Sequence, residues 1–134
     1  MTLRAVADTH AVIWYLVGDH RLSGRAREFF REVAAVGDLV GFSSITLAEI
    51  VYLTEWGRIP TNTFALLLDV TGTEASVLAE LPVNRNVAEA MRRVDRFPVS
   101  DLPDRTIAAT ALYRGVPLIS RDRKIRLSNV STLW

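Results

Sequence analysis

The sequence has no cysteine, and this absence excludes several kinds of chemistry. Without thiols the chain cannot form a disulfide framework, use a thiolate nucleophile or build a cysteine-ligated zinc site. Long apolar runs are also missing, because the longest run near the N-terminus, residues 11–17, is too short to span a bilayer. We therefore expect a soluble, cytoplasmic protein without a signal peptide or a membrane helix.

Lysine is nearly absent, and the net charge is small. Of the 16 basic residues, 15 are Arg and only Lys124 is Lys, and the formal net charge is +1. Arginine suits bidentate contact with phosphate, but a GC-rich genome would produce the same bias. The positions of the basic residues distinguish phosphate binding from codon bias better than their number does. One basic group flanks Asp122 in the sequence: Arg121, Arg123, Lys124 and Arg126.

The length and pattern of the chain predict one α/β domain, residues 1–134. With 134 residues, 49% of them hydrophobic, the chain can bury a core, and it contains no repeat or linker. Apolar runs predict strands at 3–7, 39–43, 76–83, 116–120 and 130–134. Helical spacing predicts helices at 10–17, at 45–56 and from 61 or 62 to 70. Capping residues predict one helix between Ser23 and Gly37 and another that begins after Asn84. A loop is expected at 97–103, and the last helix runs from 103 or 104 to Gly115. This alternation predicts a three-layer α/β/α sandwich around a mostly parallel central sheet of four to five strands.

Acidic residues follow two of the predicted strands. Asp8 comes directly after the first strand, and Asp122 follows the fourth by two residues. Asp104 lies where a helix is expected to begin. Because ligands of open α/β sheets bind beyond the carboxyl ends of the strands, we expect these three side chains at one edge of the sheet.

Glu49 differs from these acids because it lies inside a predicted helix. Its neighbours on the same helix face are Ile45, Tyr52, Leu53 and Trp56. We therefore expect its carboxylate on an apolar stripe, where burial requires a cation or hydrogen-bond donors. The alternative is a carboxylate at the rim of the core that reaches water or pairs with an Arg.

Four segments around these acids occur in an order that is typical of a known family. They are VADTH (6–10), SSITLAEI (43–50), DLPDRTIAATA (101–111) and LISRD (118–122). Together they resemble the PIN domain, specifically the VapC-type toxins of bacterial toxin–antitoxin pairs, over nearly the whole chain. The chain departs from these toxins at Ala48, where they often carry an aromatic residue, and at residues 102–103, where they have Pro and an aromatic residue. Neither departure removes a carboxylate.

The resemblance implies a PIN-like fold and a metal-dependent endoribonuclease that hydrolyses RNA phosphodiester bonds. Hard cations such as Mg²⁺ or Mn²⁺ prefer oxygen ligands, and this hydrolysis needs an activated water and stabilisation of charge on the phosphate. Carried over to this chain, the resemblance implies Asp8, Glu49, Asp104 and Asp122 as the catalytic and metal-binding residues. Asp101 matches the first acid of the toxins' Asp-x-x-Asp segment, and it is either a further metal ligand or the cap of the following helix. The number of metal ions stays open.

Other polar residues near the acids are candidates for supporting roles. Thr9, Ser43 and Ser120 either hydrogen-bond the ligating carboxylates or satisfy backbone groups at strand ends. His10 either contacts substrate or is a surface residue at a helix start. The basic group 121–126 either contacts RNA or belongs to a solvated loop.

The resemblance also implies protein partners. VapC-type toxins are held inactive by an antitoxin whose tail lies across the active-site groove, so it implies a hetero-oligomer with a cognate antitoxin, together with a homodimer. Trp14, Tyr15, Trp56 and Phe64 exceed what a small core obviously needs, and they belong either to an interface or to the core. No residue pattern identifies the RNA target.

Other enzymes with an acid after a strand fit less well. Haloacid-dehalogenase-like phosphatases need a second Asp where this chain has His10, and receiver domains need an acidic pair at the first strand. No Gly-x-Gly-x-x-Gly or P-loop segment is present to hold a nucleotide. The remaining alternative is a catalytically inactive PIN-fold module that binds RNA or a protein partner.

Overall fold

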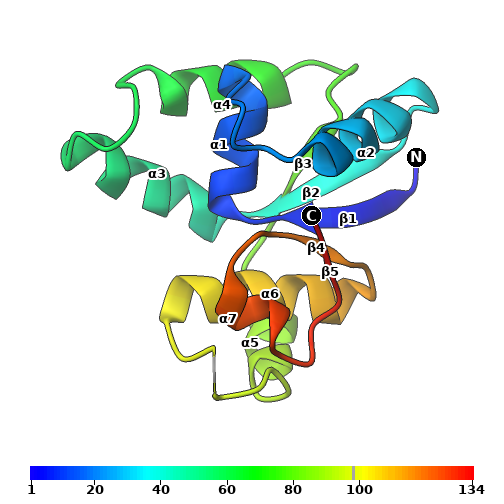
Figure 1. The fold of residues 1–134 in the computed structure, drawn as a ribbon, viewed down its shortest axis with the longest axis vertical. Helices are drawn as coiled ribbons and strands as arrows, with labels where there is room; N and C mark the ends of the chain where they lie inside the picture. The colour runs from blue at the N-terminus through cyan, green and yellow to red at the C-terminus, as the bar shows by residue number, and fades with distance from the viewer. Residues whose placement is uncertain (98) are drawn as a thin grey trace.

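The computed structural model describes residues 1–97 and 99–134 and shows an all-parallel sheet between two layers of helices (Figure 1). The order of the five strands is β3-β2-β1-β4-β5. The strands are β1 (Leu3–Ala7), β2 (Leu39–Ser43), β3 (Leu78–Leu81), β4 (Leu118–Ile119) and β5 (Thr132–Leu133). The helices are α1 (Thr9–Val17), α2 (Gly24–Ala35), α3 (Ile45–Glu55), α4 (Thr63–Thr71), α5 (Arg85–Met91), α6 (Leu102–Arg114) and α7 (Arg123–Arg126). The predicted fold class is confirmed.

Each face of the sheet has its own core, because successive residues of a strand point to opposite faces. In β1, Ala5 and Ala7 belong to the core under α1–α4, which includes Phe30, whereas Val6 belongs to the core with Ile107 of α6. Figure 1 shows α1–α4 on one side of the sheet and α5, α6 and α7 on the other. A parallel sheet covered on both faces explains the continuous apolar runs of its strands.

Local capping chemistry places several helix ends where the sequence predicts them. Ser23 accepts from the backbone N of Ala26 at 3.0 Å and starts α2, and Asn84 caps α5 in the same way. Gly115 ends α6 in the left-handed region, with φ +67. Among the helices that the structure describes, none has the length and apolar character needed to cross a membrane.

Three predicted strands are shorter than expected, and one helix was not predicted. The segment 76–83 forms a strand only at Leu78–Leu81, because the Ser76 hydroxyl bonds the backbone of Leu78 in a local turn. The segment 116–120 is reduced to Leu118–Ile119, and the segment 130–134 is reduced to Thr132–Leu133. The predicted loop 97–103 includes residue 98, which lies outside the described residues, and its end is already part of α6. The short helix α7 replaces the solvated loop considered for residues 123–126.

Gly41 leaves room for the Leu81 side chain of the edge strand β3 to pack against β2. A Cβ at this position would overlap Leu81 Cδ1 and lie 2.9 Å from Leu81 Cγ. A real Cβ does not approach a carbon atom this closely, so this site admits only glycine without movement of its neighbours.

Candidate active site

The carboxyl ends of β1 and β4 lie side by side at one edge of the sheet. The backbone N of Asp8 donates to the carbonyl of Ile119 at 3.1 Å, so the residue after β1 is tied to the end of β4. A cavity of about 630 Å³ opens at this edge. Its position beyond the carboxyl ends of neighbouring parallel strands is the usual ligand position in α/β sheets.

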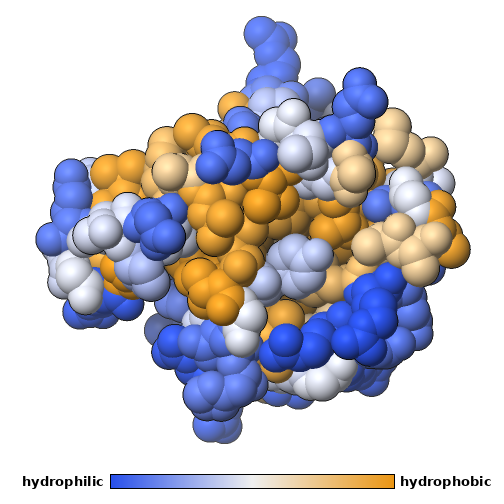
Figure 2. All heavy atoms as spheres, turned by 90° about the horizontal axis from the view of Figure 1, so that it is seen from above, coloured by the Kyte–Doolittle hydropathy of each residue, from blue (hydrophilic) through white to orange (hydrophobic). Residues whose placement is uncertain are grey.

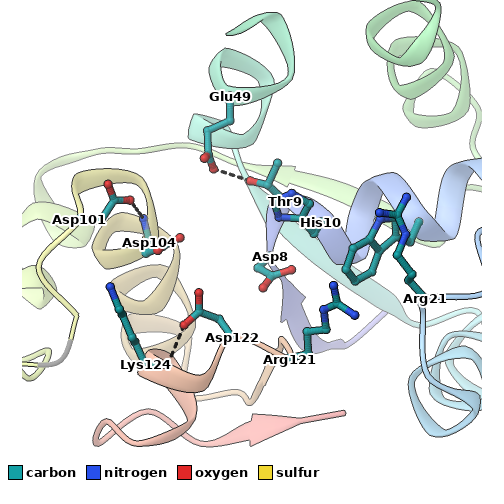
Figure 3. A pocket seen from close by; sticks show the side chains of 11 residues that line it. Asp8, Thr9, His10, Arg21, Glu49, Asp101, Asp104, Arg121, Asp122 and Lys124 are labelled. Carbon is teal, nitrogen blue, oxygen red and sulfur yellow. Dashed lines mark hydrogen bonds between the residues drawn. The ribbon is translucent and has the colours of Figure 1, made fainter. Parts of the chain in front are cut away.

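Five carboxylates line this cavity, and they come from segments far apart in the sequence (Figure 3). They are the four acids that the resemblance implies as catalytic, together with Asp101, for which a metal-binding or a capping role was considered: Asp8, Glu49, Asp101, Asp104 and Asp122. In the described part of the chain, none of the five forms an ion pair with Arg, Lys or His. Their negative charges are therefore uncompensated by direct contacts.

Three of these carboxylates are also helix N-caps. Asp8 Oδ1 accepts from the backbone N of Ala11 at 2.9 Å and caps α1. Asp101 Oδ2 accepts from the N of Asp104 at 3.3 Å and caps α6. Asp122 Oδ1 accepts from the N of Lys124 at 2.8 Å and caps α7. The structure thus shows the capping role of Asp101 and also places its side chain at the cavity.

Burial dominates the electrostatics of Asp8. Loss of solvent raises the pKa of its carboxyl, while hydrogen bonds from the Ser120 side chain and the Ala11 backbone act in the opposite direction. The charge of Asp122 adds to the increase. The Ser120 hydroxyl also accepts from the backbone N of Asp122 at 3.0 Å, so one residue after β4 contacts both acids.

Glu49 points from α3 toward Thr9 of α1 (Figure 3). Thr9 Oγ1 donates to Glu49 Oε1 at 2.5 Å and is 3.0 Å from the Thr46 hydroxyl. Burial raises the pKa of Glu49 and the Thr9 hydrogen bond lowers it. The part-buried carboxylate of Glu49 has the hydrogen-bond donor that the sequence analysis required, but the helix face around it is only partly covered, because Tyr52 and Trp56 are 62% and 65% exposed.

Asp104 lies in the first turn of α6, and the pKa of its carboxyl is strongly raised. Burial raises the pKa from 3.8 to about 7, and the charges of the other four cavity acids, Asp122 first among them, add to it. The carboxyl of Asp104 therefore titrates near neutral pH in the absence of a cation.

The hydroxyl candidates differ in what they contact. Thr9 and Ser120 bond the carboxylates of Glu49 and Asp8. Ser43 is fully buried at the end of β2, and its hydroxyl accepts from the backbone N of Ile45 at 3.2 Å, which is the backbone alternative considered for it. It does not line the cavity.

Basic side chains occupy the rest of the cavity wall. Of the predicted basic group, Arg121 and Lys124 line the cavity, whereas Arg123 and Arg126 are exposed outside it. His10 lines it as well. The sequence analysis missed Arg21, which reaches the cavity from the turn between α1 and α2 (Figure 3). No pattern around Arg21 indicates a site, because only the tertiary fold brings this turn beside β4.

The donors of the cavity suit a hard divalent cation, although they do not converge on one point. Among residues 1–97 and 99–134, no three His, Asp or Glu side chains are close enough together to hold an ion. All five acids offer carboxylate oxygens, the ligands that Mg²⁺ and Mn²⁺ prefer. Burial and mutual repulsion raise the pKa of Asp104, and a cation would remove this repulsion. The chemistry of the donor set therefore fits such an ion.

Comparisons with known proteins agree with this fold. A crystal structure of VapBC2 from Rickettsia felis, bound to a DNA fragment from their promoter, matches with a TM-score of 0.69 at 13% identity and covers 98% of each chain. A toxin–antitoxin complex from Klebsiella pneumoniae matches with a TM-score of 0.56 at 24% identity, covering 92% of this chain and 90% of the other. No curated protein matches significantly.

The family assignment rests on a match over almost the whole chain. The PIN domain family matches residues 5–131, a range that includes all five cavity carboxylates. The resemblance predicted from the four sequence segments is thereby confirmed at the level of the family. The chain belongs to the PIN domain family.

Proposed function

We propose that this protein is a metal-dependent endoribonuclease and the toxin of a VapBC-like toxin–antitoxin pair, acting in the cytoplasm. The observation that carries the proposal is the cavity itself, in which five carboxylates from distant segments meet beside basic side chains. Carboxylates alone would suit many cation sites. Carboxylates beside Arg and Lys suit a cation-assisted reaction on a polyanion such as RNA.

Asp8, Glu49, Asp104 and Asp122 would hold Mg²⁺ or Mn²⁺, with Asp101 as a further ligand. When bound, such an ion supplies activation of water and neutralisation of charge on the phosphate. The hydrogen bonds from Thr9 and Ser120 orient two of the acids before the ion arrives.

Protonation of Asp104 links ion binding to pH. With a pKa of about 7, its carboxyl carries a proton in a large share of molecules at neutral pH. An ion must displace this proton, because the ligand is the carboxylate. Ion affinity is therefore expected to rise with pH through this range.

The basic side chains would contact the RNA backbone. His10, Arg121 and Lys124 line the cavity, and exposed Arg123 and Arg126 flank it on α7. Phosphate contacts of this kind supply affinity without sequence preference.

A cognate antitoxin and a second copy of the chain are the proposed partners. Trp14 is buried and Tyr15 and Phe64 are partly buried against the core, whereas Trp56 is 65% exposed. Figure 2 views the face above α1–α4 and shows hydrophobic side chains gathered there. Exposed apolar residues on these elements include Leu68. An apolar face of this kind supports a protein partner.

An RNA cleavage assay tests the proposal directly. Purified protein is incubated with single-stranded RNA in Mg²⁺ or Mn²⁺ and in EDTA, beside Asp8→Asn. The control is Asp38→Asn, which removes an acid that pairs with Arg4 outside the cavity. We expect cleavage that requires metal, is lost in Asp8→Asn and persists in the control. A folded chain that binds RNA without cutting it would instead be the inactive PIN-fold module.

A further inference from the structure

Three basic side chains surround Trp14 at one wall of the cavity. The guanidinium carbons of Arg121 and Arg21 lie 4.4 and 5.0 Å from the centroid of the Trp14 ring, and the His10 ring lies 5.4 Å from it. The two guanidinium distances are within the range of cation–π attraction, and His10 packs on Trp14 as a tilted aromatic pair. Trp14 is only 4% exposed, so these neighbours and Trp134 cover the ring. The ring therefore holds the guanidiniums in place and is not open for a base to stack on.

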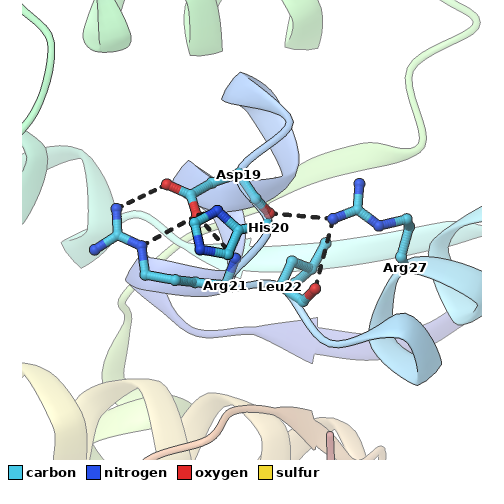
Figure 4. A network of polar contacts seen from close by, with 5 residues as sticks. All are labelled: Asp19, His20, Arg21, Leu22 and Arg27. Carbon is cyan, nitrogen blue, oxygen red and sulfur yellow. Dashed lines mark hydrogen bonds and ion pairs between the residues drawn. The ribbon is translucent and has the colours of Figure 1, made fainter.

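Arg21 is further fixed by the turn that carries it (Figure 4). Its guanidinium makes two hydrogen bonds to Asp19, at 3.1 and 2.7 Å, and these contacts hold the pKa of Asp19 well below its usual range. Arg27 of α2 donates to the carbonyl of Asp19 at 3.1 Å, and Leu22 anchors the turn in the core. An arginine restrained in this way loses little entropy when it binds a ligand.

The charges of the cavity wall are divided between two sides. Arg121 forms no ion pair within residues 1–97 and 99–134. Arg21 pairs only with Asp19 of the same turn in this part of the chain. Figure 3 shows Arg21, Arg121 and His10 on one side of Asp8, and Asp104 and Asp122, with Lys124 beside them, on the other. A phosphodiester strand that places one phosphate at the acids can place a neighbouring phosphate at the arginines.

A second cavity continues beyond Arg21. Its volume is about 450 Å³, and it shares His10, Trp14 and Arg21 with the first cavity. Its far side carries Arg58 and apolar residues such as Ile59. A strand bound at Arg21 therefore has space on both sides of the bound phosphate.

We propose that Arg21 and Arg121, held on Trp14, bind the RNA phosphate next to the one that is cleaved. This inference rests on the proposed ribonuclease function. Arg21 and Arg121 contact the substrate directly, and Asp19 is a positioning residue that keeps Arg21 in its orientation.

RNA binding in EDTA tests the proposal without cleavage. Dissociation constants for single-stranded RNA are measured over a KCl series for wild type, Arg21→Ala and Arg121→Ala. The matched control is Arg4→Ala, which removes an arginine that also pairs with an aspartate but lies outside both cavities. Each phosphate contact contributes about 0.7 to the salt slope of single-strand binding. We expect each cavity variant to weaken binding and to lower the slope by up to that amount, because both arginines contact the same phosphate, with the control unchanged.

A change in the substrate provides a second test of the phosphate contact. Once the cleavage site is mapped, a neutral methylphosphonate is placed at the phosphate on either side of it. One of these substitutions should weaken binding to the wild type as much as Arg21→Ala does, and combining the two changes should add little further loss.

The outcomes separate this inference from the proposed function. Unchanged slopes in both arginine variants, or fully additive losses with the modified RNA, would overturn the phosphate site even if the wild type cleaves RNA. If the arginine variants keep the salt slope of RNA binding but bind a protein partner more weakly, the arginines belong to that partner's site, and the phosphate site is also overturned. A wild type that fails to cleave any RNA would refute the ribonuclease, while the slopes still report on the phosphate contact.

Discussion

Asp104→Asn measures how strongly the acidic cavity destabilises the metal-free fold. Asn keeps the shape of the side chain but is neutral. The pKa of Asp104 is raised from 3.8 to about 7, by burial first and then by the charges of the other acids. Between these two values the folded state binds more protons than the unfolded state. The free energy of unfolding of the wild type should therefore fall as pH rises from about 4 to about 7.

The magnitude follows from the same two values. A difference of one pKa unit corresponds to about 1.4 kcal/mol. The raised pKa of Asp104 therefore costs up to about 4 kcal/mol at pH 8, where the folded state is ionised, and about 1.6 kcal/mol at pH 5, where only the unfolded state is ionised. Asn also loses a favourable interaction with the N-terminus of α6, worth less than about 1 kcal/mol. We expect Asp104→Asn to be more stable than the wild type by about 3 kcal/mol at pH 8 and about 1 kcal/mol at pH 5.

The assay is urea denaturation from pH 5 to pH 8, in EDTA and in millimolar Mg²⁺. The exposed Asp69 of α4 supplies a control, Asp69→Asn, outside the acidic cavity. Mg²⁺ should stabilise the wild type at pH 8 by mass action and should stabilise Asp104→Asn less. If Asp104→Asn and the wild type share one pH dependence and Mg²⁺ affects neither, the clustered acids do not form the site argued above.

Four further predictions address chemistry, positioning, packing and biology. Asp122→Asn should lower cleavage by orders of magnitude but leave RNA binding in EDTA equal or tighter, because it relieves repulsion; equal loss of both would indicate unfolding. Thr9→Val should weaken Mg²⁺ affinity by roughly 10- to 100-fold, seen as a shifted Mg²⁺ dependence of cleavage; an unshifted curve would remove Thr9 from the support of Glu49. Gly41→Ala should cost about 1–3 kcal/mol in thermal or urea unfolding, through overlap with Leu81; no loss would mean that Leu81 moves freely. Expressed alone, the protein should arrest growth of its host, and co-expression of a neighbouring small gene should relieve the arrest; normal growth with no RNA cleavage in extracts would favour the inactive module.

The parts of the fold that the sequence predicts are those set by local chemistry. The strand before Asp8, the cap at Ser23 and the glycine stop at Gly115 each depend on a few adjacent residues. The position of the site follows from one further rule: ligands of α/β sheets bind beyond the carboxyl ends of the strands, so acidic residues that follow neighbouring parallel strands lie close together there. These local signals place Asp8 and Asp122 correctly at one cavity.

The features that the sequence analysis missed depend on tertiary contacts. α7 has four residues and buries only Ile125, so it has no helical periodicity to read. Arg21 reaches the cavity only because the fold brings the turn after α1 close to Arg121, which follows β4, at the Trp14 ring. Tyr52 and Trp56 share a helix face with Glu49, but α3 buries Thr46 and Ile50 instead, and spacing alone does not choose between these faces.

The helix-capping role of three acids affects which ions the proposed metal site would prefer. Asp8, Asp101 and Asp122 each commit one oxygen to a backbone N–H, which leaves one oxygen free of the helix backbone. Chelation by both oxygens of one carboxylate, which Ca²⁺ often uses, would compete with those caps. Mg²⁺ takes single oxygens from a few carboxylates and keeps several waters. The hydrogen bonds that begin three helices would therefore also bias the proposed site toward small, hydrated ions.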